Sequence, residues 1–168
     1  IGPQLETGFE VVANDIEAAS ISALSIPEIN TLEIGDQIDP HIWLDTENAI
    51  IIAAALTREL SSQDETNAIN YQTNLNRFIN SLGDLKNEVL ADLDPSSFPP
   101  FAVYHNAYQY FENQFGLAHA ASFTSSEEIQ PGIRHVLAVK KILEQNVVQC
   151  IVVNPAINTI NLTNQLQQ

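Results

Sequence analysis

The sequence of 168 residues contains no methionine, a single cysteine and few basic residues, with six Lys and Arg against 21 Asp and Glu. The resulting formal net charge of −15 excludes a protein that binds the nucleic-acid backbone, because neutralising phosphates requires clustered basic side chains. Charged residues make up 16% of the chain and hydrophobic residues 45%, so a folded chain is expected rather than a disordered one. The length fits about one large domain.

Long apolar runs are also absent. The longest, residues 49–56, is far shorter than the roughly 20 apolar residues that a membrane-spanning helix needs. Because the sequence begins at Ile1, we expect the N-terminus of the protein, with any secretion signal, to lie upstream. Cys150 cannot form an internal disulfide, since the sequence has no second cysteine. It lies in an apolar segment, which favours an inert buried thiol or half of a bridge to another segment.

The first half of the sequence is expected to be mainly helical. Its predicted elements are a short helix near residues 2–12, a strand over 20–26, a helix from Asp45 to Leu60 and a long amphipathic helix over 64–93. Asp45 is a suitable N-cap for the third of these, which is apolar over most of its surface and is therefore expected to be buried. Ser62 and Glu65 form a capping-box sequence that predicts the start of the long helix.

The second half alternates between strand and helix patterns. The predicted strands are 101–104, 117–123 and 147–153, and the predicted helices are 106–115, 131–145 and 157–166. Gly116 is expected to end the first of these helices. This alternation predicts an α/β layer with a parallel sheet. The stretch of Ser and Pro at 95–100 is the best candidate for a domain boundary.

Two of the four histidines occupy positions that favour a binding site. His41 precedes a predicted helix, and His105 stands at the carboxyl end of a predicted strand, where ligands collect in α/β sheets. Two imidazoles together would suit zinc, copper or nickel better than magnesium or calcium. A stable zinc site needs about four ligands, so the pair alone is incomplete, and capping or packing remains the alternative role for each histidine.

The remaining candidates are weaker. We expect His119 to be structural and His135 to be a solvated surface residue. The sequence has no glycine-rich phosphate loop, no nucleophile elbow and no Cys-x-x-Cys motif, so no catalytic signature stands out. Residues 1–57 contain carboxylates but no Lys or Arg. They are interpreted as a solvated surface, with attraction of cations as the second possibility.

The histidine segments and several others together resemble the bacterial zinc-uptake solute-binding proteins of ABC transporters, the ZnuA-like branch of the metal-binding receptors. The resemblance runs in order along nearly the whole chain. Its segments are IGPQLE at 1–6, DPHIWL at 39–44, YQTNL at 71–75 with Phe78, HNAYQYF at 105–111, FGL at 115–117 and QPG at 130–132.

The resemblance implies an α/β fold in which two lobes with parallel sheets are joined by one long rigid helix. Residues 1–62 would then be the C-terminal part of the first lobe, 63–94 the connecting helix and 95–168 the N-terminal part of the second lobe. His41 resembles the first lobe's metal ligand and His105 the second lobe's. The further ligands would lie outside residues 1–168, so the chain resembles a family member that is truncated at both ends.

The implied function is that of a receptor, not an enzyme. It would capture Zn²⁺, with Mn²⁺ or another divalent transition metal as the alternative cargo, and deliver it to an inner-membrane ABC permease. The expected location is the periplasm or an anchored position on the outer surface, and the expected state is a monomer with no nucleic-acid partner. Binding should weaken as pH falls through the histidine range, about 6.5, because protonated imidazole cannot ligate.

The sequence departs from the family pattern near the proposed site. Asn106 stands where the family usually has Asp, and Asn154-Pro155-Ala156 stands where Glu-Pro-Gln is usual. Losing a carboxylate beside a dication weakens the field at the metal. In some members the cysteine corresponding to Cys150 pairs with one near the C-terminus.

Two other functions stay open. The departures favour, as the main alternative, a metal-free interaction or adhesion module on the same fold with a degenerate site. A hydrolytic metalloenzyme ranks last, because the sequence offers no evident general base.

Overall fold

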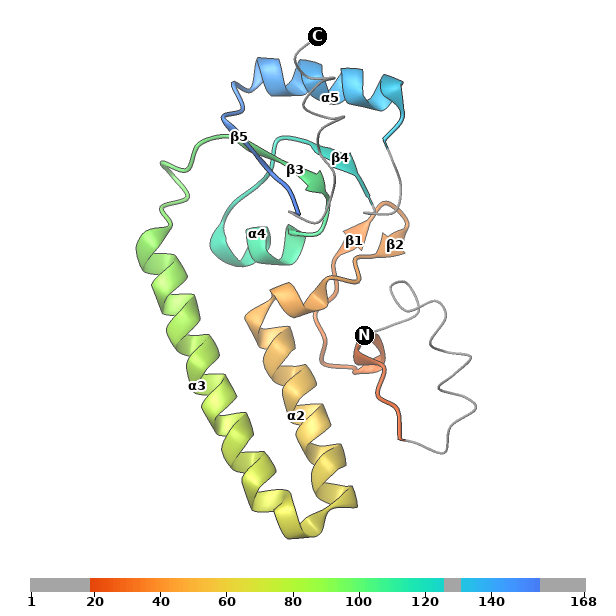
Figure 1. The fold of residues 1–168 in the computed structure, drawn as a ribbon, viewed down its shortest axis with the longest axis vertical. Coiled ribbons are helices and arrows are strands. Elements are labelled where there is room, and N and C mark those ends of the chain that lie inside the picture. Colours follow the sequence, from red (N-terminus) through yellow and green to blue (C-terminus); the bar gives the residue numbers. More distant parts are fainter. Residues whose placement is uncertain (1–18, 126–130, 155–168) are drawn as a thin grey trace. The chain divides into compact units, whose positions relative to one another are not determined.

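The structure is a computed structural model that describes residues 19–125 and 131–154 (Figure 1). It divides into two compact units, which span residues 1–92 and 93–168. The helices predicted near 2–12 and over 157–166 lie outside the described residues. No helix in the described ranges is both long and apolar enough to cross a membrane.

The described part of the first unit starts with a 3-10 turn, η1 (Ala23–Ser25), where the sequence predicts a strand. That prediction is wrong. The backbone N–H groups of Ser25 and Ile26 bond to carbonyl oxygens three residues back, at 3.0 and 3.2 Å. These groups are therefore satisfied locally, and Pro27 has no N–H to offer a neighbouring strand.

A small hairpin follows, formed by β1 (Glu33–Ile34) and β2 (Gln37–Ile38) in antiparallel register. Its tight turn places Gly35 at φ 61°, a conformation that suits glycine. The loop before the hairpin is fixed to the next helix by the fully buried Asn48. The Asn48 side chain accepts from Asn30 N–H at 2.9 Å and donates to Asn30 C=O at 2.8 Å.

Two antiparallel helices complete the first unit (Figure 1). They are α2 (Thr46–Gln63) and α3 (Ala68–Asp92), and they pack along each other. The prediction that Asp45 caps α2 is confirmed, because its side chain accepts from the backbone N–H of Glu47 at 2.8 Å. Capping satisfies a backbone donor that has no partner within the helix.

The boundary between these helices differs from the sequence-based expectation. Ser62 does not begin a helix, since α2 continues through Gln63. Asp64 takes the capping role instead and accepts from Asn67 N–H at the start of a 3-10 turn, η3 (Glu65–Asn67). The long helix therefore begins only at Ala68. A helix already under way at Ser62 leaves its hydroxyl free to bond back to the Glu59 carbonyl, at 2.8 Å.

The expectation that α2 is well buried is wrong. Only Asn48 and Ala55 are buried within it, and Leu56 is 49% exposed. Among the described residues α2 packs mainly on one side, against α3 and the turn η2 (Ile42–Leu44) that precedes it. Its remaining apolar side chains therefore meet solvent.

The second unit contains the predicted parallel sheet. Its strands are β3 (Phe101–His105), β4 (Ser122–Thr124) and β5 (Cys150–Val152), with β3 in the centre and parallel to both neighbours. The first four residues of β3 are buried, as expected for the central strand of a covered sheet.

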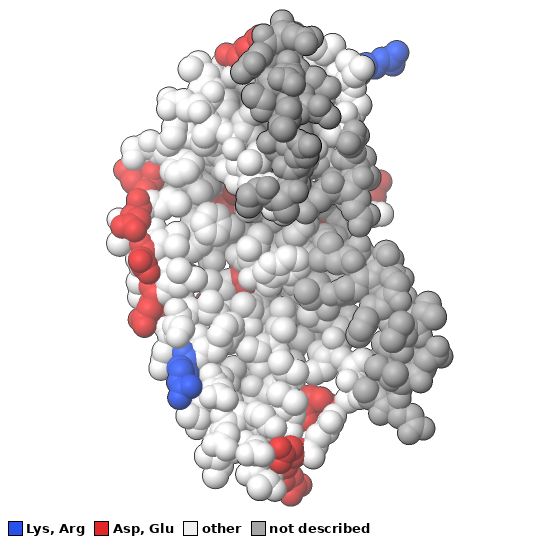
Figure 2. Space-filling model, in the orientation of Figure 1, with Lys and Arg blue, Asp and Glu red and all other residues white. Residues whose placement is uncertain are grey.

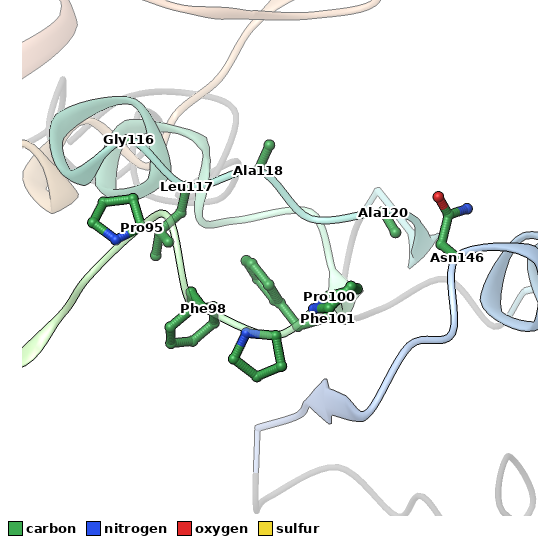
Figure 3. A pocket seen from close by; sticks show the side chains of 10 residues that line it. Pro95, Phe98, Pro100, Phe101, Gly116, Leu117, Ala118, Ala120 and Asn146 are labelled. Atoms are coloured by element: carbon green, nitrogen blue, oxygen red, sulfur yellow. The ribbon is translucent and has the colours of Figure 1, made fainter.

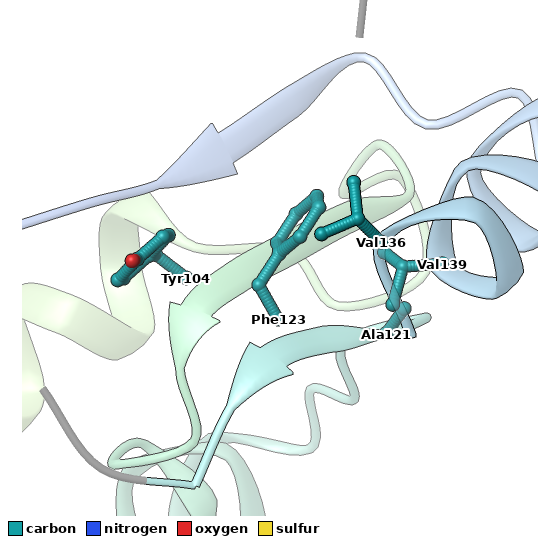
Figure 4. Packing of buried hydrophobic residues seen from close by; sticks show 5 residues of the cluster. All are labelled: Tyr104, Ala121, Phe123, Val136 and Val139. Atoms are coloured by element: carbon teal, nitrogen blue, oxygen red, sulfur yellow. The ribbon is translucent and has the colours of Figure 1, made fainter. Parts of the chain in front are cut away.

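Helices α4 (Gln109–Phe115) and α5 (Ile133–Gln145) connect these strands. Gly116 ends α4 at φ 69°, as predicted. Val136 and Val139 of α5 pack against Tyr104, Ala121 and Phe123 of the sheet to form the core of this unit (Figure 4).

Several elements are shorter than the sequence predicts. The segment predicted as a strand over 117–123 forms β4 only from Ser122, and the segment over 147–153 forms β5 only at Cys150–Val152. The helix predicted from residue 106 begins at Gln109, because Asn106 N–H still bonds to the neighbouring strand at Thr124 C=O, 3.0 Å away. Apolar character extends beyond the residues that can pair with another strand.

Candidate metal site

His41 stands in the loop that links the small hairpin to α2. It is 7% exposed and directly precedes η2, in which Ile42 is completely buried. The ring of Trp43 lies beside it, with ring centroids 5.4 Å apart and planes inclined at 59°. Buried neighbours on the same short turn limit the rotation of the imidazole.

Asp39 is the closest polar partner of His41. Its Oδ1 lies 2.6 Å from His41 Nδ1 and accepts from the His41 backbone N–H at 3.0 Å. Asp39 has no exposed surface, and its own N–H donates to Leu32 C=O at 2.8 Å across the hairpin. A buried carboxylate thus contacts the ring on the side away from Nε2, an arrangement common around metal-binding histidines.

His105 is the last residue of the central strand β3, as the sequence predicts. In the parallel register it pairs with Thr124 at the end of β4. The chain then turns, and Ala107 N–H donates to His105 C=O at 2.9 Å. His105 is partly exposed at the carboxyl edge of the sheet. This is the edge at which α/β sheets bind ligands.

His41 and His105 belong to different units. The described residues contain no group of three or more His, Cys, Asp or Glu side chains that could hold a metal. The assignment of both histidines as ligands therefore stays a prediction.

The other two histidines have local partners. His119 Nδ1 lies 2.7 and 2.9 Å from the two carboxylate oxygens of Glu112, which is 6% exposed. This pairing is consistent with a structural role for His119, although the residue stands in the loop before β4 and not within a strand. His135 is exposed, and its Nε2 contacts Ser122 C=O at 3.1 Å. The sequence analysis missed Glu112, because its partner is seven residues away.

Cys150 is exposed on β5, so the expectation of a buried thiol is wrong. Strand β5 lies at an edge of the described sheet, where an apolar sequence need not be covered. A pocket in the same unit is lined by Pro95, Phe98, Phe101, Leu117 and Asn146, among others (Figure 3). Its described lining includes no His, Cys, Asp or Glu, so it has no metal-binding chemistry.

Exposed acidic residues line the C-terminal half of α3. Asp84, Glu88 and Asp92 recur every four residues, and Figure 2 shows acidic side chains in a row along this edge. Neighbouring groups shift two other carboxyl groups. Hydrogen bonds from Asn67 and Tyr71 lower the pKa of Asp64, and bonds from Ser96 and Ser97 lower the pKa of Asp94. Both lie at helix ends, where they bond to turns.

The fold matches solved solute-binding proteins and related receptors. A crystal structure of ZnuA gives a TM-score of 0.81 at 22% identity and covers 98% of this chain and 63% of that chain. A mutant of the laminin-binding adhesin of Streptococcus agalactiae gives 0.79 at 19% identity, covering 99% and 64%. The solute-binding protein FpvC of Pseudomonas aeruginosa, solved with Mn²⁺, gives 0.71 at 23% identity, covering 84% and 54%. The fold is therefore the α/β two-lobed fold of metal-receptor solute-binding proteins.

Sequence comparison identifies the family. The family model of ZnuA, described as zinc-uptake complex component A, periplasmic, matches residues 1–168, and the chain belongs to this family. The high-affinity zinc uptake system protein ZnuA of Brucella abortus is 36% identical over 119 residues, which are 71% of this chain and 36% of the relative. The protein of the same name from Yersinia pestis is 32% identical over 115 residues, 68% of this chain and 36% of the relative. The chain thus spans about a third of the length of these relatives.

Proposed function

We propose that the protein is an extracytoplasmic receptor that captures Zn²⁺ and delivers it to an inner-membrane ABC permease. It is a transport receptor and not an enzyme. The family assignment and the names of the zinc-uptake relatives support this function. The structural observation that carries it is the contact between Asp39 and His41, because a buried carboxylate bonded to one ring nitrogen leaves the other suited to a metal.

In this proposal His41 and His105 are zinc ligands, one from each lobe. Each would bind as a neutral imidazole, and other residues would complete the roughly four ligands that zinc takes. Imidazole nitrogen favours zinc over manganese, which prefers oxygen ligands. Structures of FpvC with Mn²⁺ and Ni²⁺ make these ions reasonable competitors to include in any binding assay.

The domain organisation is proposed on the same basis. Residues 1–62 would belong to the first lobe, 63–94 would form the connecting helix and 95–168 would belong to the second lobe. The length and continuity of α3, 25 residues from Ala68 to Asp92, support a rigid connector. The proposed location is the periplasm or the outer surface, and the protein is proposed to act as a monomer.

Chelator competition tests the receptor function. Zinc affinity is measured at pH 7.5 for the full-length protein and for His41→Ala and His105→Ala. We expect tight binding by the wild type and a loss of at least about 10-fold in each variant, since each removes a ligand. His135→Ala is the matched control, because His135 is exposed and contacts only a backbone carbonyl in the described structure. Equal affinities in all four proteins would refute the assignment of ligands.

A metal-free interaction or adhesion module is the alternative function. Two observations favour it: Asn106 replaces a carboxylate beside His105, and one structural neighbour is a laminin-binding adhesin. Elemental analysis of the purified full-length protein separates the two functions. The alternative predicts no stoichiometric metal and a melting temperature that a chelator does not change, whereas the receptor predicts bound zinc and a lower melting temperature after chelation.

A further inference from the structure

We propose that Asp39 is a positioning residue, which holds His41 with its hydrogen on Nδ1 and so presents Nε2 as the metal-binding atom before any metal arrives. This inference rests on the proposed function and concerns the same site. Asp39 is not itself proposed as a ligand.

The geometry of the contact determines which group donates. The His41 backbone N–H can only donate, and it donates to Asp39 Oδ1 at 3.0 Å. The same oxygen lies 2.6 Å from Nδ1, a short distance typical of a bond that involves a charged group. Oδ1 therefore serves as acceptor for both groups, and Nδ1 carries the hydrogen. In a neutral imidazole the other nitrogen, Nε2, then keeps its lone pair.

The surroundings fix this arrangement. Asp39 has no exposed surface, and its N–H is bonded to Leu32 C=O, so the carboxylate has little freedom to move. Pro40 restricts the backbone of Asp39 to extended conformations, and these direct the carboxylate toward the two groups of His41. All these contacts lie within the first unit, so the orientation of His41 does not require the second unit.

Such partners of metal-binding histidines typically contribute 10- to 100-fold to metal affinity. We therefore expect Asp39→Asn, which removes the charge but keeps the size, to weaken zinc binding by about that factor. Glu112→Gln is the matched control, because it alters a second buried carboxylate bonded to a histidine Nδ1, that of His119, in the other unit. Asp45→Asn is a further control, since Asp45 caps α2 but belongs to no histidine pair in the described structure.

Nitrogen-15 NMR of the imidazoles in the metal-free, full-length wild type at pH 8 tests the proposal without depending on zinc or on folding of a variant. His41→Gln identifies the His41 signals. We expect the pattern of a neutral ring protonated on Nδ1, and a shift toward the other tautomer in Asp39→Asn. A ring protonated on Nε2, or an even mixture of the two forms, would overturn the proposal. If zinc fails to bind the wild type, the proposed function falls, while the tautomer still decides the role of Asp39.

Discussion

At the scale of single residues, the sequence places the histidines well but not their partners. The positions of His41 before a helix and of His105 at the end of a strand follow from local patterns, and the structure confirms both. The contact of His41 with Asp39 could have been suspected, since the two are only two residues apart. The pair of His119 and Glu112 could not, because it depends on how the loop after α4 folds back onto that helix.

This buried pair supports a prediction about stability. Glu112→Ala leaves His119 Nδ1 without its carboxylate partner and should lower the free energy of unfolding by about 1–3 kcal/mol. Urea denaturation measures the loss, and zinc affinity should stay unchanged because neither residue is a proposed ligand. A stable variant with impaired zinc binding would instead place Glu112 in the metal site.

At the scale of helices and strands, capping residues and glycines explain most boundaries. Asp45 begins α2 and Gly116 ends α4 as predicted. The capping box at Ser62 failed because two acceptable caps, Ser62 and Asp64, lie close together, and only the packing of the two helices decides between them. Strand lengths were overestimated for a similar reason, since pairing partners are not visible in a single segment.

Two glycine substitutions should have opposite effects. Gly83 lies within α3 with no atom near the position of a Cβ, so Gly83→Ala should raise the free energy of unfolding by about 0.5–1 kcal/mol. Gly116 adopts φ 69°, so Gly116→Ala should lower it by about 1–2 kcal/mol, although Pro95 leaves room for the methyl group. Urea denaturation of both variants checks the pair. Equal effects of the same sign would contradict this account of α3 and α4.

The cap at Asp64 should make stability depend on acid. Bonds from Asn67 and Tyr71 hold the pKa of Asp64 below its usual value of 3.8. A lowered pKa means that the stabilisation is complete above pH 3.8 and is lost as pH falls through the lowered value. The advantage of the wild type over Asp64→Asn in urea denaturation should therefore shrink below about pH 4. Tyr71→Phe removes one of the bonds and should raise the pKa of Asp64, as an NMR titration would show; an unchanged pKa would contradict that contact.

At the scale of the whole molecule, the composition excluded nucleic-acid partners, and the alternation of elements predicted the parallel sheet that the structure contains. The two-lobed fold itself was not derivable from periodicity. It came from the resemblance of ordered motifs to a family, which the family match over residues 1–168 confirms. Sequence spacing could not show whether two histidines so far apart in the chain share an ion.

The net charge of −15 should speed the capture of a dication. Because salt screens charges over about 10 Å at 0.1 M, raising the ionic strength from about 10 to 500 mM should slow zinc association by about 3- to 10-fold. Stopped-flow measurements with a competing fluorescent chelator give the rate. A rate that salt leaves unchanged would show that the acidic surface does not guide the ion.

X-ray absorption spectroscopy of the zinc-loaded, full-length protein tests the central claim most directly, because it counts the imidazoles bound to the ion. The account predicts imidazole nitrogens at about 2.0–2.1 Å in the wild type. It also predicts one imidazole fewer in His41→Ala and in His105→Ala, with no change in His135→Ala. A zinc spectrum without imidazole scattering, or one that both ligand variants leave unchanged, would contradict it.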